Sequence, residues 1–281
     1  MILDGKGLAK QNEITLKNRV IELKKKFGIT PSLRVILVGE SPASIAYVNS
    51  KKKACDRVGI DGEIIRLPSD ISEEVLIEKI ESLNHDDAID GILIQLPLPK
   101  HINETFVLNK VSPSKDVDGL HTINAGKLFT KQPGVVPATP LGVMMLLKHY
   151  QIPLEGKYAV VVGRSNLVGM PLAKLLNDAD ATVTVVHRKT EDITRFTKEA
   201  DILCVAVGKP NFITKDMVKP GAVVVDVGIN RVGESLVGDV DFEEVKDIAS
   251  YITPVPGGVG PMTISALLFN VLFQYEVKHH D

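Results

Sequence analysis

Short apolar runs alternate with helical patterns along most of the chain. In the first half, three apolar runs predict strands, at residues 33–39, 62–68 and 91–97. Two helical patterns separate them, at 44–58 and 72–83, and the second begins at Ser72, a residue type that favours helix starts. Strands that alternate with helices are typical of parallel sheets joined by crossover helices. The pattern therefore predicts an α/β fold.

The second half of the chain repeats this alternation after a region with weak periodicity. Residues 98–137 are rich in Pro, Gly and Asn, which favours a long functional loop. A helix is predicted over 139–150, with a Thr cap and Pro in its first turn. Four apolar runs then predict buried strands, at 158–163, 181–187, 201–208 and 222–228. Four such strands with crossovers of this length indicate a doubly wound, Rossmann-like domain.

The length of 281 residues indicates two domains, because single domains cluster around roughly 100 to 150 residues. We expect residues 1–137 to form an N-terminal α/β substrate domain and 138–262 to form the Rossmann-like domain. The strongly apolar segment 263–277 predicts a helix that needs a large surface to cover. We expect a C-terminal helix over 263–281 to complete the first domain or to bridge the two domains, with the active-site cleft between them.

Composition narrows the class of protein further. The net charge is -2 and the charged residues are spread along the chain, which argues against a nucleic-acid partner. Cys55 and Cys204 are far apart, which fits neither a disulfide framework nor a zinc site. No segment approaches the roughly 18 apolar residues of a membrane span, and the N-terminus resembles no targeting signal. We expect a cytoplasmic protein without a metal or a membrane partner.

A glycine turn in the second half is a candidate phosphate-binding site. The segment "VVVGRSNLVGMPLAKLL" (160–176) predicts strand, tight turn and helix, with Gly163 and Gly169 in the turn. Glycine there lets the backbone approach a pyrophosphate, whose charge rests on the helix N-terminus. The match to GxGxxG is imperfect, because Ser165 replaces the second glycine and the last one comes a residue late. Alone, the turn fits a plain strand-to-helix connection equally well.

The end of the next strand bears on the choice of cofactor. It ends in "VVHRKT" (185–190), where an NAD-specific site would carry Asp or Glu for the ribose hydroxyls. Arg188 and Lys189 stand there instead, and Arg164 lies in the glycine turn. Cations at this place suit a 2′-phosphate, which favours NADP over NAD. The alternative is that these are solvated surface charges.

The stretch "ASIAYVNSKKKACDR" (43–57) holds the first candidate for catalysis. Tyr47 and Lys51 lie four residues apart, and residues with this spacing share one face of a helix. They could form a catalytic pair in a cleft, or the three consecutive lysines could be a solvated charge run. The residues by themselves leave both interpretations open.

Three further segments point to one family when they are taken together. They are "DGILIQLPLP" (90–99), "KDVDGLH" (115–121) and "PVPGGVGPMT" (254–263). With "GRSNLVGMP" in the glycine turn, the chain resembles the bifunctional methylenetetrahydrofolate dehydrogenase/methenyltetrahydrofolate cyclohydrolase family of the bacterial FolD type. The resemblance runs from near the N-terminus to the last helix, and Ser165 is the residue expected in that family.

The resemblance implies two reactions on a folate one-carbon unit. NADP would oxidise 5,10-methylenetetrahydrofolate to the methenyl form, and water would open that cation to 10-formyltetrahydrofolate. It also implies a homodimer, formed through the nucleotide-binding domain, with a role in one-carbon metabolism and purine biosynthesis. We expect no room in this chain for the formate ligase domain of some relatives.

The resemblance also assigns roles to residues. Lys51 would be tied most closely to the hydrolysis, as a neutral base or as an ammonium that polarises an oxygen. Gln95 would bond to Lys51, Tyr47 would orient the folate, and Asp118 would bind the pterin, with Asp116 as the less favoured partner. Lys52 and Lys53 would then be solvated. The implied substrate-binding residues are Tyr47, Leu96, Pro97, Asp118, Pro256 and Gly257. The implied cofactor-binding residues are Gly163, Arg164, Ser165, Val168, Gly169, His187, Arg188, Gly208, Ile229, Gly258, Val259 and Thr263.

Structural and functional alternatives compete with this interpretation. Gln95 could be a structural hydrogen-bonding residue, and "KDVDG" an ordinary acidic turn. Short-chain dehydrogenases also carry YxxxK, but there the pair follows the glycine turn, whereas Tyr47 precedes Gly163 by 116 residues. A two-domain dehydrogenase of the shikimate type and a non-catalytic NADP-binding sensor are further alternatives. A sensor would predict loss of Lys51, Gln95 or Asp118, and all three are present.

Overall fold

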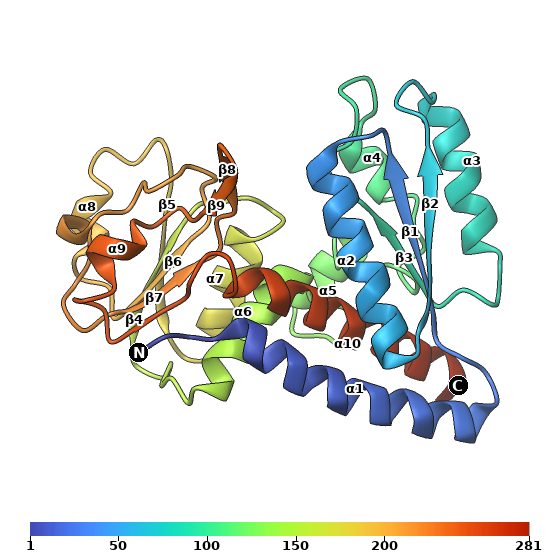
Figure 1. Ribbon diagram of the computed structural model, residues 1–281, viewed down its shortest axis with the longest axis horizontal. Coiled ribbons are helices and arrows are strands. Elements are labelled where there is room, and N and C mark those ends of the chain that lie inside the picture. The colour runs from blue at the N-terminus through green and yellow to red at the C-terminus, as the bar shows by residue number, and fades with distance from the viewer. Residues whose placement is uncertain (281) are drawn as a thin grey trace. The chain divides into compact units, whose positions relative to one another are not determined.

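The structure is a computed structural model that describes residues 1–280, and the chain divides into two compact units (Figure 1). Unit 1 comprises Met1–Lys10 and Thr139–Ala266. Unit 2 comprises Gln11–Ala138 and the chain from Leu267 onward. Two long helices contribute residues to both units: α1 (Gly5–Phe27) and α10 (Val259–His280). Residue 281, the last of the predicted C-terminal helix, lies outside the described residues.

Unit 2 contains a three-stranded parallel sheet in the order β2-β1-β3. Its strands are β1 (Ser32–Val38), β2 (Asp61–Leu67) and β3 (Gly91–Ile94). Its other helices are α2 (Pro42–Val58), α3 (Glu73–Asn84), α4 (Glu104–Leu108) and α5 (Thr122–Phe129). The central strand β1 is almost entirely buried, which explains its continuous apolar run. Ile36 and Val38 of β1 pack with Ile80 of α3 in the core of the unit.

Helix α2 is bounded by two local signals and packs beside β1 and β2 (Figure 1). The Ser41 side chain accepts a hydrogen bond from the Ser44 backbone N–H, and Pro42 occupies the first turn. The helix ends at Val58 and is capped by Gly59, which adopts a left-handed conformation with φ 87°. The buried stripe of α2 contains Lys51 among small and apolar residues, so the fold places an ionisable group in its interior.

Unit 1 contains a five-stranded parallel sheet in the order β10-β7-β6-β4-β5. Its strands are β4 (Tyr158–Val162), β5 (Thr182–Val186), β6 (Ile202–Val205), β7 (Val223–Asp226) and β10 (Tyr251–Ile252). Around them lie α6 (Ala138–His149), α7 (Gly169–Asp178), α8 (Thr194–Thr197), the 3-10 helix η1 (Lys215–Met217), α9 (Phe242–Val245) and the hairpin of β8 (Asn230–Val232) and β9 (Ser235–Val237). After β5 the chain crosses β4 to begin β6 on the other side. This is the doubly wound topology, and its switch point lies between β4 and β6.

The side chains of β4 show why this sheet is covered on both faces. Ala159 and Val161 pack in one core cluster, together with Leu172 of α7. Val160 and Val162 pack in a second cluster. Because side chains alternate between the faces of a strand, a strand buried on both sides must be apolar throughout.

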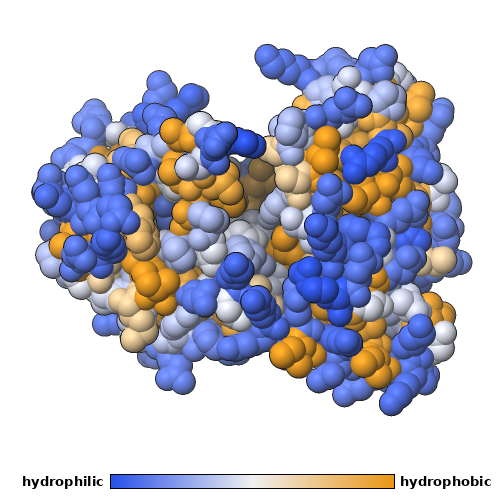
Figure 2. All heavy atoms as spheres, viewed as in Figure 1, coloured by the Kyte–Doolittle hydropathy of each residue, from blue (hydrophilic) through white to orange (hydrophobic). Residues whose placement is uncertain are grey.

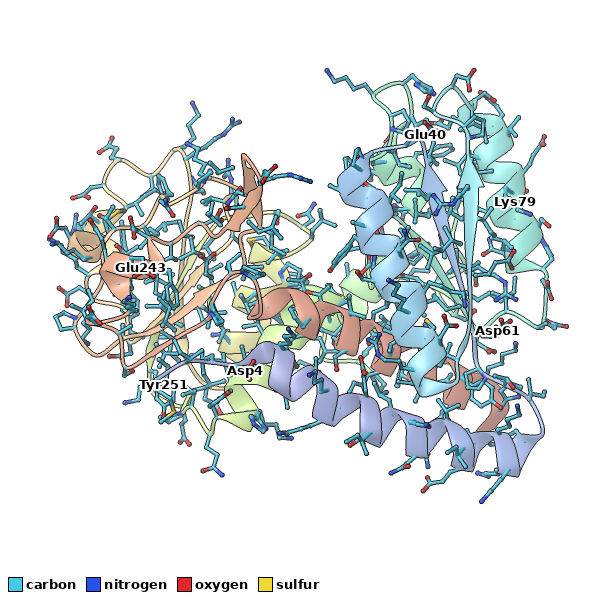
Figure 3. All side chains as sticks on the ribbon, viewed as in Figure 1. Asp4, Glu40, Asp61, Lys79, Glu243 and Tyr251 are labelled. Carbon is cyan, nitrogen blue, oxygen red and sulfur yellow. The ribbon has the colours of Figure 1, made fainter. Side chains whose placement is uncertain are left out.

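The first residues of the chain extend the sheet of unit 1. The Leu3 backbone N–H donates to the Ile252 carbonyl at 2.8 Å, and the Ile252 N–H donates to the Met1 carbonyl at 3.0 Å. Asp4 and Tyr251 mark this region in Figure 3, and the Asp4 N–H donates to the Tyr150 hydroxyl. Unit 1 therefore includes residues 1–10, which the sequence pattern grouped with 11–137, and the first three of them pair with the edge strand β10.

Several elements differ from the sequence prediction. The predicted loop 98–137 contains α4 and α5, whose N-caps are Asn103 and His121; both side chains accept hydrogen bonds from the first helical turn. The last predicted strand of the first half ends at Ile94, so Gln95 lies just beyond it. The C-terminal helix begins at Val259 instead of 263. Short helices bury few apolar residues and therefore leave a weak periodic signal.

Candidate active site

Lys51 lies in a polar cluster at the carboxyl end of the unit 2 sheet. Its side chain is buried, with 4% of its surface exposed. Its Nζ donates to Gln95 Oε1 at 3.0 Å and lies 4.7 Å from the centroid of the Tyr47 ring. Gln95 Nε2 donates to the Leu96 carbonyl at 2.8 Å, which turns the amide oxygen toward Lys51. The structure thus brings together three predicted residues from α2 and from the end of β3.

Burial and charge act in opposite directions on this cluster. Burial lowers the pKa of Lys51 below its usual value of 10.5, and the negative charge of Asp118 offsets part of that shift. Burial raises the pKa of Asp118, while the charge of Lys51 opposes the change. Lys51 is therefore neutral over a wider pH range than a solvated lysine, which is what a general base requires.

The turn "KDVDG" separates its two aspartates into different roles. Asp116 is buried, and its Oδ1 accepts the backbone N–H of Gly119 at 2.9 Å. Its Oδ2 accepts the His121 N–H at 3.0 Å and the Asn124 Nδ2 at 2.8 Å. Asp116 is therefore committed to holding the turn. Asp118 is half-buried, and its role as the carboxylate that binds the pterin stays a prediction.

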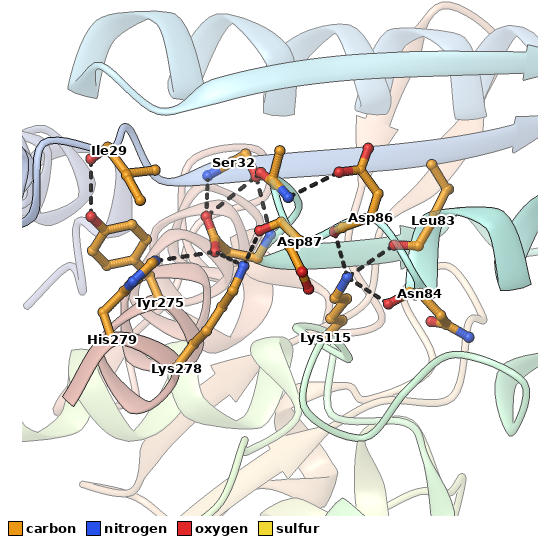
Figure 4. Close-up of polar contacts among 12 residues, drawn as sticks. Ile29, Ser32, Leu83, Asn84, Asp86, Asp87, Lys115, Tyr275, Lys278 and His279 are labelled. Atoms are coloured by element: carbon orange, nitrogen blue, oxygen red, sulfur yellow. Dashed lines mark hydrogen bonds and ion pairs between the residues drawn. The ribbon is translucent and has the colours of Figure 1, made fainter. Parts of the chain in front are cut away.

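Two residues outside the predicted set anchor this turn. Asn270 of α10 donates from its Nδ2 to the Val117 carbonyl at 2.9 Å and to the Val136 carbonyl at 2.8 Å. The Lys115 ammonium donates to the carbonyls of three residues at the end of α3 and just after it (Figure 4). A polar residue inside the apolar stretch "LLFNVLF" is a signal by which Asn270 could have been found.

The three consecutive lysines differ in burial, as their positions around the helix predict. Lys52 forms an ion pair with Asp56 on the outer side of α2, and Lys53 is exposed. Cys55 continues the buried stripe, and burial raises the pKa of its thiol to about 12. A thiol that stays protonated is a poor nucleophile, so Cys55 is a packing residue.

In unit 1, the glycine turn after β4 requires glycine at both predicted positions. Gly163 has φ 123°, and a Cβ there would lie 2.2 Å from the Ala206 carbonyl oxygen. A Cβ on Gly169 would lie 2.2 Å from the Gly163 carbonyl oxygen. Ser165 Oγ accepts the backbone N–H groups of Val168 and Gly169 at 3.2 and 3.4 Å. The serine therefore supports the turn in a position where the general fingerprint has glycine.

The predicted cations emerge at the same edge of the sheet as this turn. β4 and β5 pair in register from Tyr158↔Thr182 to Val162↔Val186, so the residues that follow them are neighbours. Arg164 Nη1 lies 3.2 Å from His187 Nε2, and Arg188 is exposed beside them. Positions 187–190 contain no carboxylate. These residues fit a dinucleotide that carries a 2′-phosphate.

The other predicted cofactor-binding residues lie after the remaining strands of the unit 1 sheet. Gly208 follows β6, Ile229 follows β7, and Gly258, Val259 and Thr263 lie at the start of α10. A cavity of about 110 Å³ lies at this edge. Its lining includes Ile229, Pro256, Gly257, Gly258 and Val259. The carboxyl ends of the strands in an open α/β sheet are where such folds bind nucleotides.

Residues 1–280 contain neither a membrane-crossing helix nor a cluster of metal-binding side chains. In that range no helix combines the length and apolar character that a membrane crossing requires, and the face drawn in Figure 2 mixes hydrophilic with apolar residues. Nor do three or more His, Cys, Asp or Glu side chains of the described chain gather as a metal ion would require.

A doubly wound unit with a glycine turn, and a second α/β unit with a buried lysine, define the class of two-domain dinucleotide-binding enzymes. The family model for the tetrahydrofolate dehydrogenase/cyclohydrolase catalytic domain matches residues 3–118. The model for the NAD(P)-binding domain of the same family matches residues 137–279. The chain belongs to the tetrahydrofolate dehydrogenase/cyclohydrolase family.

Individual relatives agree with this assignment over nearly their whole length. The chain is 56% identical over 272 residues to "Bifunctional protein FolD" of Wolinella succinogenes, covering 96% of this chain and 95% of the relative. The FolD structure from Campylobacter jejuni has a TM-score of 0.96 at 52% identity, covering 99% of each chain. A Trypanosoma brucei FolD structure complexed with NADP and an inhibitor has a TM-score of 0.97 at 38% identity, covering 100% of this chain and 99% of the other.

The shikimate-type alternative is not favoured by these comparisons. A shikimate 5-dehydrogenase structure from Thermus thermophilus matches at 18% identity with a TM-score of 0.54, covering 89% of this chain and 98% of the other. A similarity at this level shows a shared fold only.

Proposed function

We propose that this protein oxidises 5,10-methylenetetrahydrofolate with NADP and then hydrolyses the 5,10-methenyl product to 10-formyltetrahydrofolate. The observation that carries the proposal is the buried Lys51, which bonds to Gln95 at 3.0 Å within the region that matches the family's catalytic domain. We assign folate binding to residues 1–137 with the C-terminal helix, and NADP binding to 138–262. A homodimer and a cytoplasmic location belong to the same proposal and rest on the family resemblance.

In the hydrolysis, Lys51 acts on the attacking water. Its lowered pKa favours the neutral amine, which accepts a proton as the water oxygen bonds to the methenyl carbon. Gln95 holds the amine by accepting one of its N–H bonds, so the lone pair keeps a defined direction. A folate ring nitrogen then accepts a proton as its bond to that carbon breaks.

Folate binding is assigned to groups with complementary chemistry. The Asp118 carboxyl accepts N–H bonds from the edge of the pterin, which presents several donors. The Tyr47 ring offers an apolar face for stacking next to Lys51. Leu96 and Pro97 follow Gln95 and continue this site along the chain. The substrate-binding residues predicted from the sequence also include Pro256 and Gly257, which belong to unit 1.

The proposed cofactor site uses the carboxyl edge of the unit 1 sheet. NADP supplies the hydride acceptor when it is bound. Gly163 and Gly169 allow the close backbone contacts that shape the turn, and the N-terminus of α7 favours the charge of the pyrophosphate. Arg164 and Arg188 hold the 2′-phosphate. The hydride transfer itself depends on proximity and requires no acid or base from the chain.

The two activities can be tested directly on the purified protein. With methylenetetrahydrofolate and NADP, absorbance should report NADPH formation, and added methenyltetrahydrofolate should be hydrolysed. The same assay with NAD tests the cofactor assignment, because the cationic strand end favours NADP. Absence of reduced cofactor with either nucleotide would contradict the dehydrogenase assignment and favour a non-catalytic sensor.

Replacement of Arg188 by Ala should impair the use of NADP selectively. We expect the KM for NADP to rise at least about 10-fold, because a charge-assisted bond to phosphate is lost. The KM for NAD should stay unchanged, because NAD has no 2′-phosphate. Steady-state kinetics with both cofactors measure the effect, and Arg195→Ala, the same change at an exposed site of unit 1, is the control. An equal rise of the KM for both cofactors would contradict the assignment of Arg188 to the 2′-phosphate site.

A further inference from the structure

Two buried aspartates lie behind the cofactor edge of unit 1 and belong to neither predicted site. Asp226 is the last residue of β7, and Asp239 follows the β8–β9 hairpin. Their exposed fractions are 3% and 0%. Buried carboxylates are costly unless hydrogen bonds compensate them, so their partners show what they hold in place.

Asp239 binds the loop that follows β6. Its Oδ2 accepts the backbone N–H of Val207 at 2.6 Å and of Gly208 at 2.9 Å, and its Oδ1 accepts that of Lys209 at 2.8 Å. Three consecutive N–H groups directed at one carboxylate determine the conformation of the loop. Asn230 of the hairpin adds a fourth bond, from its Nδ2 to Asp239 Oδ1 at 2.8 Å.

This loop borders the switch point of the sheet. Ala206, which immediately precedes it, presents the carbonyl that lies 2.2 Å from the Cβ position of Gly163. Gly208 has φ 65° and open space where a side chain would stand. The loop and the glycine turn therefore form adjacent parts of one wall at the place where doubly wound sheets bind dinucleotides.

Asp226 in turn fixes the backbone of Asp239. Its Oδ1 accepts the Asp239 N–H at 3.0 Å, and its Oδ2 accepts the Val240 N–H at 2.8 Å. A Cβ on Gly238 would lie 1.8 Å from Asp226 Oδ2, and one on Gly228 would lie 2.2 Å from Asp239 Cγ. Each aspartate thus occupies space that a glycine of the opposite segment leaves open. Burial raises the pKa of Asp226 to about 7, although three backbone N–H bonds favour its charged form.

We propose that Asp239 is a positioning residue that holds the loop 207–209 in the conformation that binds the dinucleotide. Asp226 supports it by fixing the Asp239 backbone. The proposal rests on the proposed function of unit 1. Because a protein carboxylate already satisfies the loop's N–H groups, the loop is ordered before the ligand arrives. Binding then costs less conformational entropy than it would with a mobile loop.

Asp239→Asn tests this role, because an amide NH₂ replaces one acceptor oxygen and opposes a backbone donor. We expect the dissociation constant for NADPH, measured by fluorescence titration, to rise at least about 10-fold, since bonds to a charged acceptor are lost. The KM for NADP should rise in parallel, while kcat changes less. Methenyl hydrolysis should stay within about 2-fold of wild type, because Lys51 and Gln95, the residues proposed to act in that step, lie in unit 2. Asp241→Asn is the matched control, since Asp241 caps α9 and Asn caps helices equally well.

The outcomes separate this proposal from the proposed function. A wild-type protein that fails to bind NADPH would contradict the function of unit 1. Wild-type binding together with unchanged affinity in a folded Asp239→Asn variant would overturn the positioning role, as would an equal loss of binding and methenyl hydrolysis. If that variant does not fold, Asn230→Ala decides, because it removes only the side-chain donor to Asp239. We then expect about 3-fold weaker binding, and unchanged binding would overturn the proposal.

Discussion

Lys51→Met should lower methenyl hydrolysis by at least about 100-fold, the range in which a general base acts, while hydride transfer keeps most of its rate. Methionine keeps an unbranched side chain that is one atom shorter than that of lysine, and it can neither accept a proton nor donate a hydrogen bond to Gln95. The hydride step needs proximity alone, so it should tolerate the change. Separate assays of the two reactions on one preparation measure the difference.

The control for this variant lies two residues away. Lys53→Met makes the same chemical change at an exposed position of α2 and should leave both activities at the wild-type level. An equal loss of both activities in Lys51→Met would contradict a specific role of Lys51 in the hydrolysis. It would indicate a disturbed folate site instead.

The pH dependence of the hydrolysis follows from the same residue. We propose the neutral amine of Lys51 as the active form, so the rate is expected to rise with pH and to level off as Lys51 loses its proton. Because burial lowers the pKa of Lys51, the plateau should be reached below the usual lysine value of 10.5. A rate that falls as pH rises through this range would favour the ammonium as the active form.

Asp118→Ala should impair both reactions, because both use the same bound folate. We expect kcat/KM for methylenetetrahydrofolate to fall by about 10- to 100-fold, the effect of removing a charged hydrogen-bond acceptor. NADPH binding should be unchanged. Asp70→Ala, at an exposed position of unit 2, is the matched control. A loss of NADPH affinity with unchanged folate kinetics would refute the role given to Asp118.

The Asp118→Ala variant also tests the electrostatic coupling between Asp118 and Lys51. The negative charge of Asp118 raises the pKa of Lys51 against the effect of burial. Its removal should therefore lower the pKa of Lys51 further and move the rising limb of residual hydrolysis to lower pH. An unchanged pH profile would show that the two charges are not coupled.

The predictable parts of the fold were those with a strong local pattern. β4 is apolar at every position because both faces of the sheet are covered, so its existence followed from the sequence. The glycine turn could also be predicted, because its conformation requires a local residue type: a side chain at Gly163 would collide with the Ala206 carbonyl. α4 and α5 were missed because helices this short bury few apolar side chains.

Residue pairs that are distant along the chain were harder to predict. Lys51 and Gln95 are separated by 44 positions, and helical spacing can say nothing about a bond between them. Only the family resemblance suggested it. The hydrogen-bonded pair of loops held by Asp226 and Asp239 was not predicted. The two carboxylates accept bonds from backbone N–H groups, which nearly every residue type carries.

The sequence by itself determined the doubly wound unit, the glycine turn with its cationic strand end, and the face that Tyr47 and Lys51 share. These properties depend on periodicity and on residues close together in the chain. The tertiary structure decided which ionisable groups lose water and which partners they find there. It separated Asp116, which holds a turn, from Asp118, and it buried Lys51 while leaving Lys53 in solvent. Desolvation and long-range contact shift pKa values and fix side chains, and both exist only once distant segments pack together.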